Sequence, residues 1–439
     1  MKESMFNIYY KAPDGAKLAF NSLSCGLAIV DDKYETMLSK IDEINDDNIG
    51  EELKDVYLAA REGNFIVSSD KNELAELAVK RNIQKYYLGD LALTIAPTLA
   101  CNFKCVYCYE SAKIGNMSKS IQEKLVDFIE KQAKHLNSLQ INWYGGEPLL
   151  AIDVIRSLSD RFIEISQKHN LTYNAFMISN GSLLNDTIIN DLIKYHVKGI
   201  QITLDGPPEV HDSRRVSKNG VFQFNKIIEN INKLLQTKKI DVVIRINVDK
   251  NNTADVEKLI AILNEKLIEK NVKITFGQVT AYTDACKSVE NTCYNNIEFS
   301  SNILRYFDII EKYGFDEYNE FPYPDAKLNY CCAEVANSFV VDFEGYFYKC
   351  WNEVGNIKSS IGNLNDENLD LLNYKEAVWL LRNPLMVPKC KECKILPICM
   401  GGCPYNTCIK QEDNSCDWFK YNLQDIVLKY YDKYQNSQC

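Results

Sequence analysis

Sixteen unevenly spaced cysteines are the feature that most constrains this chain of 439 residues. Three of them lie close together at Cys101, Cys105 and Cys108, and ten lie from Cys331 to the end. The start of the chain lacks the apolar run of a secretory signal, and no stretch reaches the roughly 18 apolar residues of a membrane helix. We therefore expect a cytoplasmic protein with no membrane partner. Because disulfides are disfavoured in that compartment, clustered thiols predict iron–sulfur or zinc sites.

The charge of the chain argues against one class of partner. The formal net charge is −10, whereas binding to phosphate backbones needs basic patches. We expect no nucleic-acid partner.

The sequence divides into three regions, and the central one predicts the fold class. Residues 89–318 alternate apolar strand candidates with amphipathic helical stretches; the strands are expected at 91–97, 139–145, 172–181, 199–206, 241–249 and 272–279. Six such βα units imply an α/β fold whose parallel sheet curls into a partial barrel. Ligands bind such sheets at the carboxyl ends of the strands.

The two flanking regions differ from the central one. Residues 1–88 predict a small sheet, with strands near 6–12, 17–23 and 26–30, followed by helical periodicity near 34–44, 51–62 and 72–83. Residues 319–439 are rich in Cys, Gly and Tyr, so metal clusters are expected to organise them. One last amphipathic helix is predicted near 418–434.

The first cysteine group has the spacing C-x-x-x-C-x-x-C and directly follows the first predicted strand. Three thiolates on one tight loop can bind three irons of a [4Fe–4S] cube and leave the fourth iron open for a chelating substrate. A structural zinc site is the alternative, but zinc needs a fourth ligand, and no Cys or His stands between residues 109 and 134. Tyr107, inside the loop, is a candidate to cover a bound cofactor.

Polar residues and glycines follow the next strands. Gly145 and Gly146 allow a close approach of the backbone to a ligand, and Glu147 is placed to accept from an ammonium group. The later strand ends offer polar partners for ribose hydroxyls or a carboxylate: Ser179, Asn180, Asp205 and Arg245. Each of these residues is also compatible with an ordinary turn or a satisfied polar pair.

The second cysteine group contains seven spaced positions. One of the adjacent pair Cys331 and Cys332 precedes a G-x-x-x-x-C element that ends at Cys350, and the remaining members are Cys390, Cys393, Cys399, Cys403 and Cys416. Seven thiolates are one short of two four-thiolate clusters. Zinc is again an alternative, since paired C-x-x-C elements also bind zinc.

Taken together, the cysteine triad, the Gly-Gly-Glu-Pro turn and the carboxyl-terminal spacing resemble radical S-adenosylmethionine (SAM) enzymes with a SPASM domain. The resemblance covers residues 90–420 and implies three [4Fe–4S] clusters with SAM as cofactor. It assigns the triad to the SAM cluster and Gly145, Gly146 and Glu147 to the methionine amino group. One auxiliary cluster would use Cys390, Cys393, Cys399 and Cys416. The other would use Cys350, Cys403 and one of Cys331 or Cys332, with Cys331 preferred.

The fourth ligand of that last cluster stays open at this stage. The candidates are Cys286, Cys293, the second member of the adjacent pair, Cys408, or an iron left open for substrate.

The amino-terminal region resembles, in layout alone, the winged-helix-like peptide-recognition element of ribosomal-peptide maturases. An exposed edge strand there can receive an extended leader peptide. The resemblance thus implies an enzyme that cross-links a precursor peptide by a thioether or carbon–carbon bond, with flavodoxin or ferredoxin as its reductant. The rival enzyme is an anaerobic sulfatase maturase, which carries an Asp where this chain has Trp351. A thiolate zinc-binding protein is the non-enzyme alternative.

Overall fold

The computed structural model describes residues 1–110, 113–412 and 416–438. Contacts between Cα atoms divide the chain into two compact units. The sheet unit contains residues 87–321 and 335–380, and the cysteine unit contains residues 1–86, 322–334 and 381–439.

Six parallel strands in sequential order form the centre of the sheet unit. They are β6 (Asp90–Ile95), β8 (Ser138–Trp143), β9 (Thr172–Ser179), β10 (Val197–Thr203), β12 (Asp241–Val248) and β13 (Val272–Gln278). Each strand pairs in parallel with the next one along the chain. These are the six strands that the sequence predicts, and the mixed α/β class with a large parallel sheet is confirmed.

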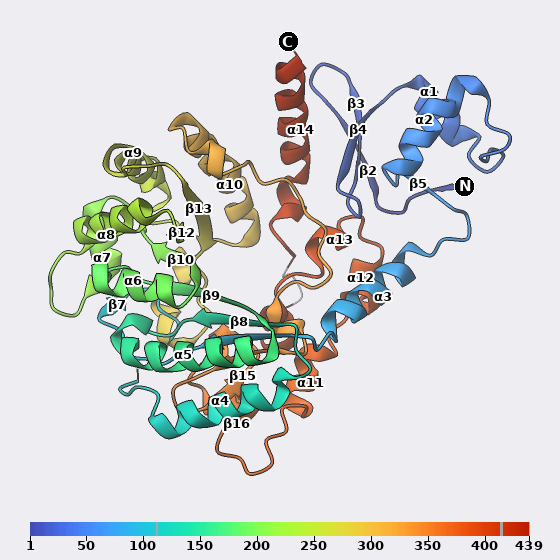
Figure 1. Ribbon diagram of the computed structural model, residues 1–439. Helices are drawn as coiled ribbons and strands as arrows, with labels where there is room; N and C mark the ends of the chain where they lie inside the picture. The colour runs from blue at the N-terminus through green and yellow to red at the C-terminus, as the bar shows by residue number, and fades with distance from the viewer. Residues whose placement is uncertain (111–112, 413–415, 439) are drawn as a thin grey trace. The chain divides into compact units, whose positions relative to one another are not determined.

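Helices connect these strands, and Figure 1 shows several of them along the outer side of the sheet. The long connecting helices are α4 (Lys119–Ala133), α5 (Ile152–His169), α6 (Asp186–Lys194), α8 (Phe224–Thr237), α9 (Val256–Lys266) and α10 (Asn296–Lys312). Side chains cap several of their first turns; Ser118 and Asn185, for example, accept from backbone N–H groups of α4 and α6. The shorter elements of this unit are β7 (Phe103–Cys105), α7 (Pro208–Arg214), β11 (Arg215–Ser217) and α11 (Tyr374–Leu380).

A hairpin from the third sequence region extends the same sheet. β14 (Ser338–Val341) pairs in parallel with β6, and β15 (Tyr346–Tyr348) and β16 (Gly362–Asn363) follow as antiparallel strands. Gly345, at φ +84°, forms the turn between β14 and β15. The sequence did not predict this addition, because pairing across more than two hundred residues leaves no local signature.

The amino-terminal part of the cysteine unit has the predicted sheet and helices. β2 (Asn7–Lys11), β3 (Lys17–Asn21) and β4 (Gly26–Val30) form an antiparallel sheet with β3 in the middle. A separate pair joins β1 (Lys2–Glu3) to β5 (Ile66–Val67), and the helices are α1 (Asp32–Ser39), α2 (Glu51–Glu62) and α3 (Glu73–Lys85).

This amino-terminal part shares a core with the carboxyl-terminal cysteine segment. Phe6 and Leu77 are buried in one cluster with Leu385, Leu396 and Met400. The later segment contributes α12 (Pro388–Lys391), α13 (Leu396–Cys399), a π-helix (Tyr405–Ile409) and α14 (Phe419–Gln438). Residues 1–86 are therefore not packed as an independent body.

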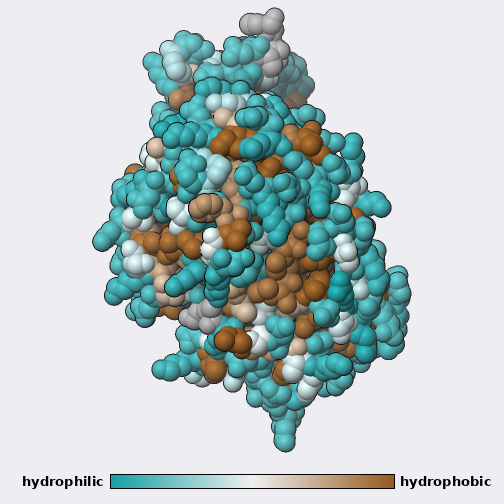
Figure 2. Space-filling model, turned by 90° about the vertical axis from the view of Figure 1, so that its left-hand side faces the viewer, coloured by the Kyte–Doolittle hydropathy of each residue, from teal (hydrophilic) through white to brown (hydrophobic). Residues whose placement is uncertain are grey.

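Among the described residues, no helix is both long and apolar enough to cross a membrane. On the face seen in Figure 2, hydrophilic residues interrupt the hydrophobic patches.

Candidate functional site

The first cysteine triad lies on the loop between β6 and α4. The middle of the loop is held by β7, which pairs with β11 so that Cys105 lies opposite Arg215. The pKa of the Cys101 and Cys108 thiols is raised to about 12, mainly by burial, and the charge of Cys105 contributes to the rise at both. The three thiols therefore share one electrostatic environment. They need a soft cation to become thiolates there, so their donor chemistry fits an iron–sulfur cluster.

Within the described ranges, no three His, Cys, Asp or Glu side chains converge closely enough to hold a metal ion. The predicted ligand sets therefore stay predictions.

The turn after β8 passes very close to the cysteine loop. A Cβ atom on Gly145 would lie 2.4 Å from the Thr98 carbonyl oxygen, and one on Gly146 would lie 2.3 Å from the Ala100 carbonyl oxygen. Gly145 also adopts φ +110°. Only glycine fits at both positions, since Cβ contacts under 3.0 Å force a shift of the backbone. The glycines thus fix the turn directly against the loop that carries the triad.

Glu147 links this turn to the end of β9. Its carboxylate is fully buried and accepts from Ser179 Oγ at 2.8 Å, from Asn180 N at 2.8 Å and from Leu149 N at 3.2 Å. Burial raises the pKa of Glu147, and these hydrogen bonds oppose the rise. Three predicted site residues therefore meet in one network. The carboxylate keeps limited capacity for a further donor such as an ammonium group.

Two residues that the sequence analysis missed complete this network. Asn180 Nδ2 donates to Asn102 Oδ1 at 2.8 Å, and Asn102 Nδ2 donates to Ser182 Oγ at 2.9 Å. Asn102 follows Cys101 directly, so the amide chain ties the end of β9 to the triad. The only sequence signal for Asn102 was its place inside the cysteine loop.

A second network joins Tyr107 to the ends of β10 and β12. Tyr107 OH donates to Asp205 Oδ2 and accepts from Arg215 Nη1 at 2.7 Å and Asn247 Nδ2 at 3.2 Å. Asp205 is fully buried, and burial raises its pKa while Arg215 and Arg214 lower it. Tyr107 therefore points into the strand ends, where it fixes the loop. No sequence motif points to Arg215, which lies on the short strand β11.

Arg245 lies on β12, the same strand as Asn247. Its Nε donates to Asn247 Oδ1 at 3.0 Å, and the side chain is half-buried. A Cβ atom on Gly277 would lie 2.1 Å from Arg245 Nη2, so Gly277 makes the space that the guanidinium fills. The guanidinium is thus held at the strand ends, where it can bind a carboxylate.

A cluster of aromatic and acidic side chains near the triad was also missed. Tyr109 OH and Tyr144 OH are hydrogen-bonded, and the Tyr144 ring packs against Trp351 at 4.8 Å between centroids. Burial raises the pKa of Glu110 to about 7. This cluster gives the site an apolar wall beside the cysteine loop.

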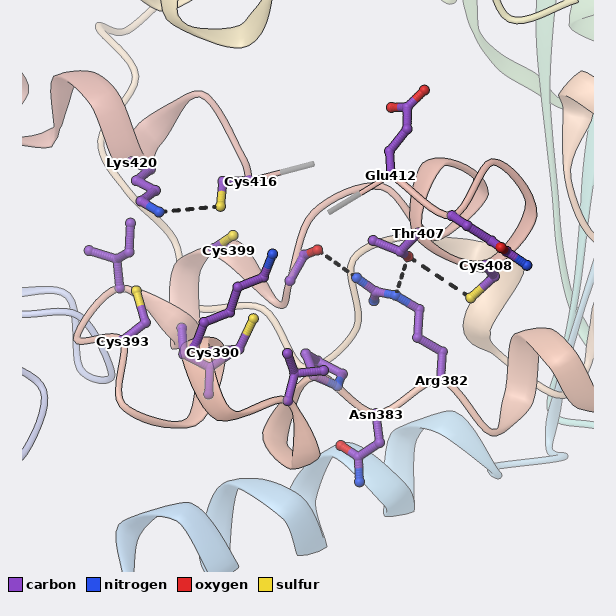
Figure 3. A pocket seen from close by; sticks show the side chains of 17 residues that line it. Arg382, Asn383, Cys390, Cys393, Cys399, Thr407, Cys408, Glu412, Cys416 and Lys420 are labelled. Atoms are coloured by element: carbon purple, nitrogen blue, oxygen red, sulfur yellow. Dashed lines mark hydrogen bonds between the residues drawn. The ribbon is translucent and has the colours of Figure 1, made fainter. Parts of the chain in front are cut away.

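In the cysteine unit, four predicted ligands line one cavity of about 390 Å³. In Figure 3, Cys390, Cys393, Cys399 and Cys416 gather on one side of Arg382. Lys420 Nζ donates to Cys416 Sγ at 3.4 Å. Asp417 N donates to Cys399 Sγ, also at 3.4 Å. Donors to sulfur and four soft ligands around one cavity fit an iron–sulfur cluster.

The remaining predicted ligands fall in both units. Cys331, Cys332 and Cys403 belong to the cysteine unit, where the charges of Cys332 and Cys403 add to the burial that raises the pKa of Cys331 to about 12. Cys350 follows β15 in the sheet unit. Cys286 is buried in that unit, and Cys293 lies in it as well.

The family comparison agrees with this site. Residues 95–263, from the end of β6 to α9, match the Radical SAM superfamily. This range contains the triad and the strand-end residues that the sequence predicts.

Two groups of relatives differ in how much of the chain they match. A cysteine-type anaerobic sulfatase-maturating enzyme of Clostridium perfringens is 25% identical and covers 78% of this chain and 93% of its own length. The radical SAM cyclopropyl synthase TigE of Paramaledivibacter caminithermalis is 21% identical and covers 95% of this chain and 93% of its own length.

Solved structures with a similar fold also differ in how much of the chain they cover. Native anSMEcpe with bound AdoMet superposes with a TM-score of 0.61 at 21% identity, covering 77% of this chain and 98% of its own. Streptococcus suis SuiB bound to S-adenosylmethionine has a TM-score of 0.53 at 14% identity, covering 92% of this chain and 95% of its own. Residues 95–263 form a radical SAM domain, and the chain is an enzyme with homologues in the radical SAM superfamily.

Proposed function

We propose that this chain modifies a ribosomally made precursor peptide, forming a thioether or a carbon–carbon cross-link through a 5′-deoxyadenosyl radical. The observation that carries the proposal is the extent of the matches. The synthase TigE and the structure of SuiB with its precursor peptide SuiA each cover 95% of this chain, whereas anSMEcpe covers 77%. A match over 95% of the chain must include most of residues 1–86, which supports a role for this part of the chain that TigE and SuiB have in common.

SAM and three [4Fe–4S] clusters are the cofactors in this proposal. Cys101, Cys105 and Cys108 would hold the SAM cluster, and the auxiliary clusters would use the ligand sets that the spacing predicts. Bound SAM supplies the carbon radical when it receives an electron. The residues of this chain orient it: Glu147 and Arg245 offer an acceptor and a donor for its amino and carboxylate groups. The Tyr144–Trp351 wall limits access of water to the radical.

The sheet of residues 7–30 would bind the leader of the peptide. Ala12 N donates to Ala16 O at 2.8 Å, which identifies that opposed pair as hydrogen-bonded. Along an antiparallel strand, successive residues direct their N–H and C=O groups alternately to the two neighbouring strands. In the register of this sheet, the N–H groups of Leu27 and Ile29 in β4 therefore point away from β3. The Ile29 side chain is 52% exposed. An extended leader can pair with this free edge by strand addition.

The test uses anaerobically reconstituted full-length enzyme with SAM and a flavodoxin or ferredoxin as reductant. The substrate is the peptide of a short cysteine-rich open reading frame beside the gene. We expect the peptide to lose the mass of two hydrogens, with one new cross-link and stoichiometric 5′-deoxyadenosine. An unchanged peptide together with continued SAM cleavage would contradict the peptide proposal and leave the radical enzyme intact.

Oxidation of a sulfatase Cys or Ser to formylglycine is the second candidate. The sequence similarity to the Clostridium perfringens sulfatase-maturating enzyme favours this function. Trp351 counts against it, because sulfatase maturases are expected to carry an Asp at this position. A short peptide carrying a sulfatase target cysteine separates the two functions. Formylglycine in that peptide would establish the sulfatase function.

A further inference from the structure

A buried group of cations lies near Cys408, a thiol that the proposed clusters leave without an assignment. Arg81 and Lys85, from α3, are 2% and 1% exposed, and both donate to the Arg382 carbonyl, at 2.9 and 3.1 Å. The Arg382 guanidinium is itself largely buried. Three buried cations are costly unless anions compensate them.

The carboxylates of the protein compensate only part of this charge. Glu334, which is fully buried, pairs with Arg81 at 2.8 Å and with Arg382 at 3.0 Å. It is the one carboxylate of the described residues that forms an ion pair with any of the three cations. Arg81 Nε is buried without a hydrogen-bond partner in the described structure. The group therefore has more positive than negative charge, and its side chains are at most 8% exposed.

Glu334 and Arg382 also hold the segments that carry the nearby thiols. Glu334 N donates to the Cys331 carbonyl at 3.2 Å, and Glu334 Oε2 accepts from Tyr330 N at 2.9 Å, so the glutamate fixes the turn of the adjacent pair. Arg382 donates to the Gly401 and Gly402 carbonyls at 2.7 and 2.9 Å, directly before Cys403. The Arg382–Glu334 ion pair thus joins the Cys331 turn to the Cys403 segment.

A π-helix then turns the chain so that Cys408 returns toward Cys403. The Cys403 carbonyl accepts from both N and Oγ1 of Thr407, each at 3.2 Å, and Lys410 N donates to Tyr405 O in the i to i+5 pattern. π-helices are rare and frequently lie at functional sites. Arg382 Nε donates to Thr407 Oγ1 at 2.9 Å, next to Cys408. In Figure 3, Cys408 lies on the opposite side of Arg382 from Cys390, Cys393, Cys399 and Cys416.

We propose that Cys408 is a ligand of the same auxiliary cluster as Cys331 and Cys403, and that Arg81, Lys85 and Arg382 compensate the negative charge of that cluster. This assignment rests on the proposed function. A [4Fe–4S] cube with four thiolates is an anion, and each thiol releases its proton when it binds iron. Burial and the charge of Arg81 lower the pKa of Lys85 to about 8, and the charge of Cys408 acts in the opposite direction.

The first test isolates the auxiliary clusters in full-length enzyme with Cys101, Cys105 and Cys108 all changed to Ala. In that background, Cys408→Ala is compared with Cys25→Ala, which removes a half-buried thiol of the same unit. We expect Cys408→Ala alone to alter one reduced-cluster signal in electron paramagnetic resonance, and added cyanide to change that signal by binding the exposed iron. Identical iron content, spectra and cyanide response in the two variants would overturn the assignment. A background protein with stoichiometric zinc and no iron would instead overturn the auxiliary clusters themselves.

The second test leaves every thiol in place. Lys85→Met removes one buried charge, while Lys80→Met removes an exposed lysine from the same helix. A nearby cation stabilises the reduced cluster, which carries one more negative charge than the oxidised cluster. We therefore expect the midpoint potential of one auxiliary cluster to shift negative in Lys85→Met and to stay unchanged in Lys80→Met. Equal potentials in the two variants would overturn the role of the cations.

Discussion

At the residue scale, the tight turn after β8 is the most sensitive contact of the site. Gly146→Ala would place a Cβ atom 2.3 Å from the Ala100 carbonyl oxygen. We expect a loss of about 1–3 kcal/mol of stability, as for other overpacked positions, and weaker SAM binding because the triad loop is displaced. Chemical denaturation and equilibrium SAM binding measure the two effects. Gly50→Ala is the control, since nothing lies within 4 Å of its Cβ position; equal effects of the two changes would contradict the expectation.

Glu353 makes the stability of the protein depend on pH. Its carboxyl is 5% exposed, and burial raises its pKa from the ordinary 4.5 to about 8. Between these two values the folded state binds a proton that the unfolded state has released, so stability falls as pH rises through this window. Glu353→Gln should therefore be more stable than the parent at pH 8 and no more stable at pH 4. Denaturation curves at several pH values measure this difference, and a pH-independent difference would contradict it.

Sequence reasoning found two kinds of site residue: the glycines and polar residues that directly follow predicted strands, and the cysteines whose spacing suits metal binding. Gly145, Gly146, Glu147, Ser179 and Asn180 all meet beside the cysteine loop because parallel strands end at one edge of the sheet. It could not find Arg215 or Glu334. Their importance comes from partners far away in the chain, and no local spacing encodes such contacts.

At the element scale, the free edge of β4 gives the sharpest test of leader binding. Ile29→Pro removes an N–H that points away from β3, so the sheet itself keeps its ladder. We expect the affinity for a labelled leader to fall roughly threefold to tenfold, the value of about one hydrogen bond. Fluorescence anisotropy measures it, with Ile29→Ala as the control that loses the side chain and keeps the donor. An unchanged affinity in Ile29→Pro would mean that the leader does not pair with β4.

The secondary structure was predictable where its signal is local. Apolar runs bounded by turns predict the six parallel strands, and 3.6-residue periodicity predicts α2, α3 and α14. Such reasoning could not predict that the hairpin of β14 and β15 joins the main sheet. Its strands are short, and their place beside β6 is decided by packing against a strand from another region.

At the scale of the whole molecule, iron content distinguishes the main alternatives. We expect about twelve irons per chain after anaerobic reconstitution, from three cubes of four. Changing Cys101, Cys105 and Cys108 together to Ala should leave about eight irons and abolish 5′-deoxyadenosine formation. Iron and zinc analysis with chromatography of the SAM products measures both. A triple variant that still cleaves SAM would contradict the role of the triad, and about four irons with stoichiometric zinc would contradict the auxiliary clusters.

The shared core of the cysteine unit determines how the amino-terminal part can be tested. Removing residues 1–86 would expose Leu385, Leu396 and Met400 and would leave Glu334 without Arg81. We expect such a truncated chain to lose iron from the cysteine segment as well as leader binding, as iron analysis and leader titration can show. Normal iron content in the truncated chain would mean that the carboxyl-terminal segment folds without the amino-terminal one.

The late arrival of β14 has a consequence for synthesis on the ribosome. β6 is complete at residue 95, but the strand that covers one of its sides begins only at residue 338. At roughly 5–20 residues per second, that side stays unpaired for roughly 10–50 seconds. Leu93 and Ile95, fully buried in the finished protein, lie on this strand. Nascent chains that stop before residue 338 therefore present an apolar strand edge to one another, and translational pausing in this interval favours their aggregation.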